Sequence, residues 1–366
     1  MHRFKSVMPC LKFVLLGVVI LVGIYLRIQW RIAADFVGDE LYFYSNVKGA
    51  LKPFWQQITY GEVMAFPGQY LSVWPFVQMS EKLNFNVFVA VIPHILACLA
   101  SYFFLYCVCR KLLNRYLSIL IVFGLYSFHP EFIVHAFELR PYAVLPLISL
   151  VSFCSLDRMI LGWGAFSVTK KLMFIALFLC MTFYHFYGII IIGFCAFYFF
   201  LQESYRIKSL QWVYPFFPYI GGFLVIALPV ILWYMGSTIS LSGLEMHTFE
   251  YIPNPMVDFV GFGKAIAGNL MGYKMFYPLL LGVPLAFFVS NRNRIEKLVF
   301  AVVLIGLPIC FLLFTAILKG YWFLQRQFIW VTPFFLVFVG WCWDTIFCFI
   351  GNKFKKMGEH ETTELV

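Results

Sequence analysis

The chain has 366 residues, of which 62% are hydrophobic, 21% aromatic and only 12% charged. Its mean hydropathy is +0.86, whereas a soluble domain carries about 25% charged residues and under half of its residues are apolar. This composition excludes a water-soluble enzyme, a disordered chain and a disulfide-rich secreted scaffold. It predicts an integral membrane protein that crosses the bilayer many times.

Apolar runs long enough to span a bilayer core recur along the chain and predict about ten transmembrane helices. They lie near residues 11–28, 86–109, 116–137, 142–156, 172–185, 188–202, 214–235, 276–290, 298–318 and 328–350. Basic residues flank the stretch 172–202 on both sides, so we expect it to cross twice and to turn near His185–Gly188. The expected fold class is an all-α polytopic membrane protein with both termini on one side.

The basic residues are unevenly divided between the two sides of this topology. One side carries as many acidic as basic residues, and the other carries most of the 27 basic residues and the whole net charge of +10. The positive-inside rule places the basic side in the cytoplasm. We therefore expect a multi-pass protein of the inner (plasma) membrane with cytoplasmic N and C termini, and the charge requires no nucleic-acid partner.

Two outer segments, 27–85 and 236–275, are long, whereas the inner loops are short. The first carries apolar residues at the spacing of one helical face, which predicts an amphipathic helix in the membrane interface: Val47, Leu51, Phe54, Trp55 and Ile58. A second such helix is expected over 257–270, in the fourth outer loop. We expect a single transmembrane domain, 1–350, with a cytoplasmic tail, 351–366, and function at the outer membrane surface.

Adjacent carboxylates, Asp39 and Glu40, follow the first apolar run closely. Such a pair can supply a general base together with a supporting acid or a metal ligand. A structural alternative is that Asp39 only caps a helix, because Gly38-Asp39 precedes a helix-compatible run.

A second group of polar residues lies at the outer end of the third span. Glu131, His135 and Glu138 are spaced i, i+4, i+7 and are expected to share one helical face. Pro141 is expected to end that helix, so that Arg140 reaches the membrane edge with a guanidinium suited to phosphate. A purely structural Glu–Arg pair and, less favoured, a zinc site at His135 are the alternatives. His185, Tyr187 and Arg326 are further candidates on the same side, although each alone is more often an interfacial anchor.

These residues resemble a known family. Asp39-Glu40 after the first helix is similar to the first outer loop of the GT-C glycosyltransferases, in the branch of the protein O-mannosyltransferases and lipid A aminoarabinose transferases. The stretch from His129-Pro130 to Glu138-Leu-Arg140-Pro141-Tyr142 resembles that branch's acidic-x-Arg-x-Tyr pattern, and Phe66-Pro67-Gly68-Gln69 resembles its proline-rich turn. Two features depart from the pattern, because Gly68 replaces the second proline and no lysine lies near the turn.

The resemblance implies transfer of a sugar from a polyprenyl-phosphate-sugar donor to a glycan, lipid or protein hydroxyl, on the outer face and with inversion. It implies Asp39 as general base, Glu40 as its support, and Arg140 and Arg326 as ligands of the donor phosphate. The expected substrate cavity is formed by Tyr42, Gln69, Glu131, His135, Glu138, Tyr142, His185 and Tyr187. No cofactor is required, although a divalent cation is compatible with this chemistry.

Two other classes remain as alternatives. A secondary transporter or lipid flippase would carry ionisable residues near the bilayer midplane in two related halves, whereas the polar residues here gather near one face. Asp344, in the last span, is the exception. An O-antigen-type polymerase or ligase would concentrate its arginines in a late outer loop instead.

Overall fold

The computed structural model describes residues 2–34, 36, 39–49, 67–209, 211–239, 252–289, 293–319 and 325–363, and within these ranges the secondary structure is entirely helical. The helices are α1 (His2–Ala33), α2 (Asp39–Val47), α4 (Pro67–Lys82), α5 (Val87–Ala90), α6 (Ile92–Leu112), α7 (Tyr116–Phe128), α8 (Pro130–Val134), α9 (Leu145–Gly162), α10 (Val168–Tyr184), α11 (Tyr187–Ile207), α12 (Phe217–Ile239), α13 (Phe259–Met271), α14 (Gly282–Val289), α15 (Arg294–Ala301), α16 (Leu307–Lys319) and α17 (Thr332–Thr363). The expected all-α class is confirmed.

Short tight turns connect several of these helices. Stretches of 3-10 helix lie at Pro141–Ala143, Trp163–Ala165, Gln211–Phe216, Lys274–Leu281 and Gln325–Phe328, and a π-helical stretch, Val302–Gly306, joins α15 to α16. The expected turn between the fifth and sixth spans is confirmed, because only His185 and Phe186 separate α10 from α11.

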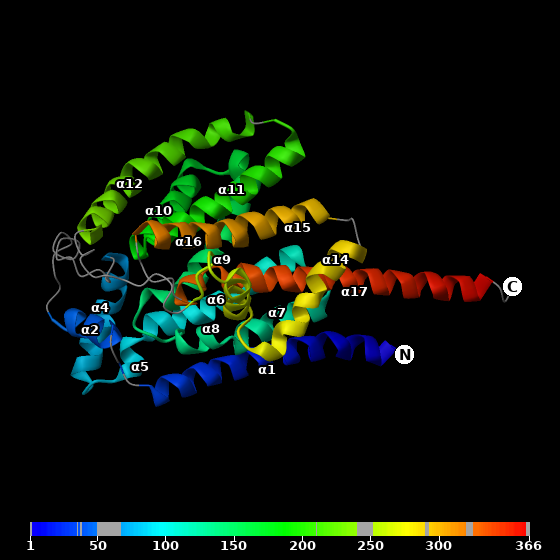
Figure 1. Cartoon of the computed structure of the whole chain (residues 1–366), viewed down its shortest axis with the longest axis horizontal. Helices are drawn as coiled ribbons and strands as arrows, with labels where there is room; N and C mark the ends of the chain where they lie inside the picture. Colours follow the sequence, from blue (N-terminus) through cyan, green and yellow to red (C-terminus); the bar gives the residue numbers. More distant parts are fainter. Residues whose placement is uncertain are drawn as a thin grey trace.

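Seven helices in the described part of the chain are long and apolar enough to cross a membrane, and an eighth span is formed if one bent pair is counted. The protein is therefore a multi-pass membrane protein. The count of about ten is not established by length and composition, because α7 has 13 residues and α10 has 17. The long helices run along one axis, and the free ends of α1 and α17 lie at the same end of the molecule (Figure 1).

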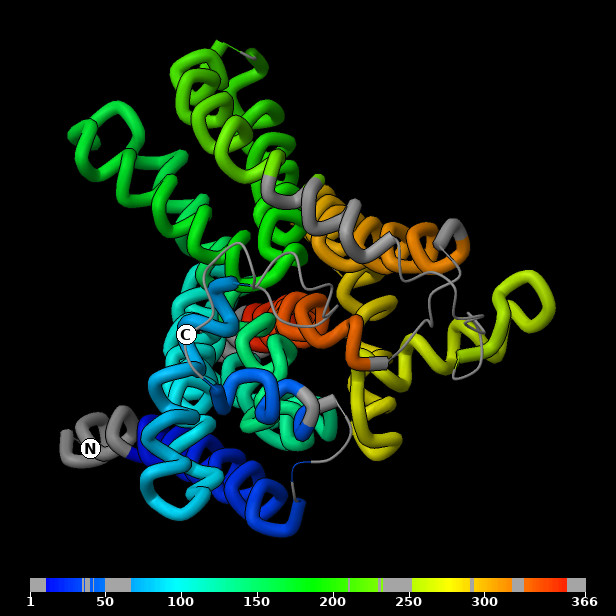
Figure 2. The backbone as a smooth tube through the Cα atoms, turned by 90° about the vertical axis from the view of Figure 1, so that its left-hand side faces the viewer, coloured from blue at the N-terminus to red at the C-terminus, as the bar shows by residue number. Residues whose placement is uncertain are grey.

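Helix α17 forms the centre of the bundle, as the view along the helices shows (Figure 2). Its first half is buried, with Val337 and Val339 fully enclosed, and it packs against α6, α7, α9 and α14. Outward-facing side chains of α1 and α12 remain apolar and exposed, Phe13 at 65% and Val225 at 74%. Apolar residues turned outward are stable only against lipid, which agrees with the membrane assignment.

The first long segment is more helical than the sequence indicates. Helix α1 continues to Ala33, and Pro67–Lys82 forms α4, so the expected proline-rich turn at 67–71 is the start of a helix instead. A proline fits there because the first residue of a helix needs no intrahelical N–H bond. The predicted amphipathic helix over 47–58 lies mostly outside the described residues, since α2 ends at Val47.

The second long segment contains α13, close to the helix expected over 257–270. Helix α13 meets the following helical stretch, Lys274–Val289, at an angle of 99°. Gly272 makes the bend with φ +78°, a backbone conformation that side chains with a Cβ rarely adopt. A Cβ there would also lie 2.5 Å from the Cδ of Pro130, so the bend packs directly on the junction between α7 and α8.

Candidate functional site

The junction between α7 and α8 determines where the second polar group lies. Helix α7 ends at Phe128, Pro130 begins the short α8, and α8 ends at Val134. The expectation of one continuous helix ended by Pro141 is therefore wrong, because Pro130 cannot continue the backbone hydrogen bonding of α7. The chain leaves helical structure before His135 is reached.

Glu131, His135 and Glu138 nevertheless come together. His135 Nε2 lies 3.2 Å from a carboxylate oxygen of Glu131, and its Nδ1 hydrogen-bonds Glu138. Glu131 and His135 are one helical turn apart, as predicted, because His135 caps α8 and its backbone N–H still bonds to the carbonyl of Glu131. Glu138 joins them because the chain turns after α8, so the single helical face predicted for all three residues is wrong for Glu138 only.

The carboxylates of Glu131 and Glu138 favour the protonated form of His135. Burial opposes the charge on His135, but hydrogen bonds and the negative charges of Glu131 and Glu138 outweigh it and raise the pKa of His135 to about 9. Burial alone would raise the pKa of Glu138, yet the bond and charge of His135, with Arg140 and Arg326 nearby, lower it. At neutral pH the trio therefore holds a cation between two carboxylates.

Arg140 and Arg326 converge on one aromatic ring. The guanidinium carbon of Arg140 lies 6.0 Å from the centroid of the Tyr142 ring, and that of Arg326 lies 5.2 Å from the same centroid. Both distances fit cation–π contacts. Arg140 is 2% exposed, and Arg326 comes from the stretch Gln325–Phe328 that precedes α17. Two arginines that are far apart in the sequence thus share a site beside Glu138.

His185 and Tyr187 lie in the same region. His185 Nδ1 accepts a hydrogen bond of 3.1 Å from the backbone N–H of Tyr187. Burial lowers the pKa of His185 to about 3, and the positive charge of Arg140 contributes to that shift. His185 is therefore neutral at physiological pH, and its ring can orient a group but does not supply a proton.

Glu40 is buried and forms an ion pair and a hydrogen bond within the protein. Its Oε1 lies 2.7 Å from a guanidinium nitrogen of Arg31 and accepts a bond of 2.6 Å from the backbone N–H of Leu139. Burial raises the pKa of Glu40, while the Leu139 hydrogen bond and Arg31 oppose that rise. Glu40 thus ties the start of α2 to the residue before Arg140, a positioning role.

The side chains of Asp39 and Tyr42 lie outside the described residues, so their predicted roles stay predictions. The backbone of Asp39 is described, and it begins α2 directly before Glu40. Because Glu40 bonds to Leu139, the start of α2 lies on the same side of the molecule as Arg140. The hypothesis drawn from the sequence requires Asp39 and Arg140 to lie on the same side of the membrane.

Arg27 and Arg31 were not recognised as site residues from the sequence. Arg27 is 1% exposed and donates to the carbonyl of Gly23 on its own helix and to the carbonyls of Tyr126 and Ser127 at the end of α7. Arg31 follows one helical turn later and pairs with Glu40. The sequence did contain a signal for them, namely two arginines spaced i, i+4 at the end of an apolar helix. Charged side chains inside or at the edge of a membrane need polar partners, so this spacing indicates a polar site nearby.

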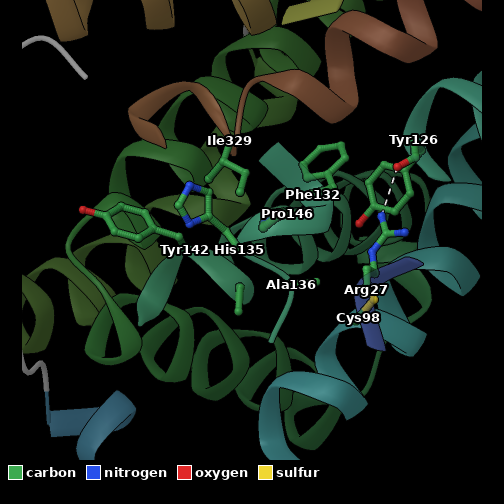
Figure 3. A pocket seen from close by; sticks show the side chains of 10 residues that line it. Arg27, Cys98, Tyr126, Phe132, His135, Ala136, Tyr142, Pro146 and Ile329 are labelled. Carbon is green, nitrogen blue, oxygen red and sulfur yellow. Dashed lines mark hydrogen bonds between the residues drawn. The ribbon is translucent and has the colours of Figure 1, made fainter. Parts of the chain in front are cut away.

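A small cavity lies between Arg27 and His135, as Figure 3 shows with the residues that line it. Phe132, Tyr142 and Ile329 also form its wall. Its volume is about 10 Å³, the space of about one water molecule. This cavity is too small for a sugar.

Gln69 lies on α4 and is fully buried, with no hydrogen-bond partner for either polar atom of its amide. Buried amides are almost always hydrogen-bonded, so Gln69 is a strong candidate for contact with a bound molecule. It is near the α10–α11 turn, because a Cβ at the preceding Gly68 would lie 2.8 Å from the backbone nitrogen of Tyr184. The predicted place of Gln69 near His185 is consistent with this packing.

Asp344, which the sequence places near the inner end of the last span, bonds to the backbone at the start of α7. Its carboxylate accepts bonds from the backbone N–H groups of Asn114, at 3.1 Å, and Arg115, at 2.6 Å. It therefore caps the beginning of α7. Within the described residues no group of three His, Cys, Asp or Glu side chains is arranged to hold a metal ion.

Comparison with known proteins adds no relative. No family model matches the chain, and no curated protein matches it. The arguments for function therefore rest on the residues and their geometry.

Proposed function

We propose that the protein is an integral-membrane glycosyltransferase that uses a polyprenyl-phosphate-sugar donor and an acceptor hydroxyl. One observation carries this proposal: Arg140 and Arg326 meet on the Tyr142 ring, while Glu40 ties the start of α2 to Leu139, next to Arg140. Two cations beside the first carboxylate loop are what transfer from a phosphate leaving group requires. The resemblance of the same residues to the GT-C pattern points to the same reaction.

In the proposed reaction Asp39 takes the proton of the acceptor hydroxyl as its oxygen attacks the anomeric carbon. The new glycosidic C–O bond forms on one face while the bond from that carbon to the phosphate oxygen breaks on the other, which inverts the configuration. The phosphate leaves with the electron pair of the broken bond. Arg140 and Arg326 stabilise the charge that develops on it.

The trio around His135 supports this arrangement of charges. Against burial, which raises it, the bond and charge of His135 and the charges of Arg140 and Arg326 lower the pKa of Glu138, so this carboxylate lies in the field of both guanidinium groups. Its other partner, the charged His135, prevents Glu138 from neutralising both arginines fully. The result is a net positive site suited to a phosphate.

We also propose the finer topology. Ten crossings result if α7 and α10 span the membrane together with the eight longer segments, and the positive-inside rule then places both termini and the tail, 351–366, in the cytoplasm. The polar site would face the outside of the inner membrane. A single domain over 1–350 would bind the donor lipid there and take a glycan, lipid or protein as acceptor.

Release of polyprenyl phosphate from radiolabelled polyprenyl-phosphate sugars, measured in membranes that contain the protein, tests the proposal. We expect Asp39→Asn to lower the rate at least about 100-fold, since general-base catalysis contributes 10²–10⁴. Arg140→Ala and Arg326→Ala should each weaken donor binding more than acceptor binding. Lys170→Gln, a lysine far along α10 from the site, is the control.

Full activity in Asp39→Asn would disprove the base assignment, and unchanged donor affinity in both arginine variants would disprove the phosphate site. Solute counterflow into liposomes, without sugar release, would assign the protein to the transporter or flippase class instead.

A further inference from the structure

A large apolar pocket lies among α9, α10, α11 and α12, away from the site described above. Its volume is about 380 Å³, within the range of pockets that hold small molecules. None of its lining residues belongs to the candidate site. Three of the helices around it, α10, α11 and α12, are the green segments that project at the top of Figure 2.

The lining of this pocket is suited to a hydrocarbon chain. Aliphatic and aromatic side chains such as Ile175, Phe178 and Ile192 form the wall. Gly193 lies on the same wall, and a Cβ added there would meet no atom within 4 Å. Phe197 and Leu224 keep over 40% of their surface exposed, so the pocket is open toward the surroundings of the bundle, where lipid chains lie.

One end of the pocket carries a cation held over aromatic rings. The ammonium nitrogen of Lys171 lies 4.8 Å from the centroid of the Trp163 ring and 5.8 Å from that of Tyr219. Trp163 and Tyr219 both line the pocket. Trp, Tyr and Lys together are characteristic of the level of lipid headgroups. The pocket therefore runs from a cationic interfacial end into an apolar interior.

We propose that this pocket binds one acyl chain of an anionic phospholipid, whose phosphate contacts Lys171. The headgroup would come from the leaflet at the α9–α10 end of the bundle. Lys171 and Tyr184 are separated by about 20 Å of helix at 1.5 Å per residue. The lipid headgroup therefore lies far from the Arg140 site, and the proposal stands independently of the glycosyltransferase reaction.

Native mass spectrometry of the protein, extracted from vesicles of equal parts phosphatidylglycerol and phosphatidylcholine, tests this. We expect one phosphatidylglycerol to remain bound per protein after detergent exchange. Gly193→Leu should reduce retention about tenfold or more, because its side chain takes the space of several methylene groups. Ala196→Met, on the same wall, is a second filling variant should the first fail to fold. Gly17→Leu in α1, where a Cβ also meets nothing within 4 Å, is the matched control.

The headgroup contact is tested with neighbouring lysines. Lys171→Gln should lower the preference for phosphatidylglycerol about fivefold, the effect of one lysine at an anionic surface. Lys170→Gln should leave it unchanged, because Lys170 lies over Phe166, which is not part of the pocket. Equal retention of both phospholipids by the wild type, or undiminished retention by the filling variants, would overturn the proposal. Preferential retention of an added polyprenyl phosphate would assign the pocket to the donor and also overturn it.

Discussion

At the residue scale, His135 is held in its protonated form by the two carboxylates that contact it. The pKa of His135 is raised from 6.5 to about 9 in the folded protein, so its contribution to stability is complete below pH 6.5 and is lost as the pH rises through 9. Each pKa unit corresponds to about 1.4 kcal/mol, which gives the trio at most about 3 kcal/mol at low pH.

Thermal unfolding of the detergent-solubilised protein between pH 6 and 9.5 measures this. We expect the wild type to lose stability over that interval and His135→Gln to start less stable and to change less. His360→Gln, a change in the C-terminal tail, should keep the wild-type slope. A slope that is the same in His135→Gln and the wild type would show that the trio does not titrate as described.

Arg31 and Glu40 form the second residue-scale unit, and both are more than 90% buried. Removing one charge of a buried pair leaves the other without compensation, at a cost of about 3–5 kcal/mol. We therefore expect Arg31→Met and Glu40→Gln to destabilise the protein strongly, and the double variant to lose less than the sum. Unfolding midpoints of the three variants give the coupling energy. Additive losses would mean that the pair does not couple α1 to α2.

At the element scale, Asp344 on α17 caps the N-terminus of α7 by accepting hydrogen bonds from the backbone N–H groups of Asn114 and Arg115. Asp344→Ala should cost about 2 kcal/mol, because it removes a charged acceptor from two backbone N–H groups. Asp157→Asn, which breaks the more exposed pair with Lys111, should cost under about 1 kcal/mol. The free energies of unfolding of the Asp344→Ala and Asp157→Asn variants give this comparison. Equal losses would contradict the capping role of Asp344.

The packing around Gly68 explains why a glycine, and not a second proline, follows Pro67. A Cβ at this position would lie 2.8 to 2.9 Å from backbone atoms of Phe183 and Tyr184, so neither proline nor alanine fits between α4 and α10. Gly68→Ala should cost about 1–3 kcal/mol through overpacking. Gly124→Ala in α7, where a Cβ meets nothing within 4 Å, should be neutral or slightly stabilising. The free energies of unfolding of both variants show whether α4 packs this closely against α10.

The elements differ in how far the sequence predicts them. The α10–α11 turn was predictable from the basic residues at both ends of the stretch 172–202. If both ends lie on the same side of the membrane, the chain must turn back in the middle, on the opposite side. The break before α8 was signalled by Pro130 but was hidden by the apolar run around it. The hydrogen bonds of Glu40 with Leu139 and of Arg31 with the carbonyl of Phe137 depend on helix packing over about 100 residues of sequence, which no local pattern contains.

At the scale of the whole molecule, the open question of topology concerns α7 and α10, which are shorter than the seven clear spans. A span of 17 residues is near the lower limit for a bilayer core, and a shorter one requires protein around it, as α17 provides for α7. We therefore expect both helices to cross.

Fusions of green fluorescent protein and of alkaline phosphatase after residues 114, 138, 166, 186 and 209 test this crossing. Fluorescence reports the cytoplasm and phosphatase activity the outside, so we expect fluorescence after 114, 166 and 209 and phosphatase activity after 138 and 186. A fluorescent fusion at the C-terminus is the control for the orientation of α17. If the fusions after 166 and 186 report the same side, α10 does not cross and His185 cannot share a membrane face with Arg140. In the folded protein His185 is near enough to Arg140 that, besides burial, the charge of Arg140 lowers its pKa, so the crossing and the composition of the candidate site stand or fall on the same measurement.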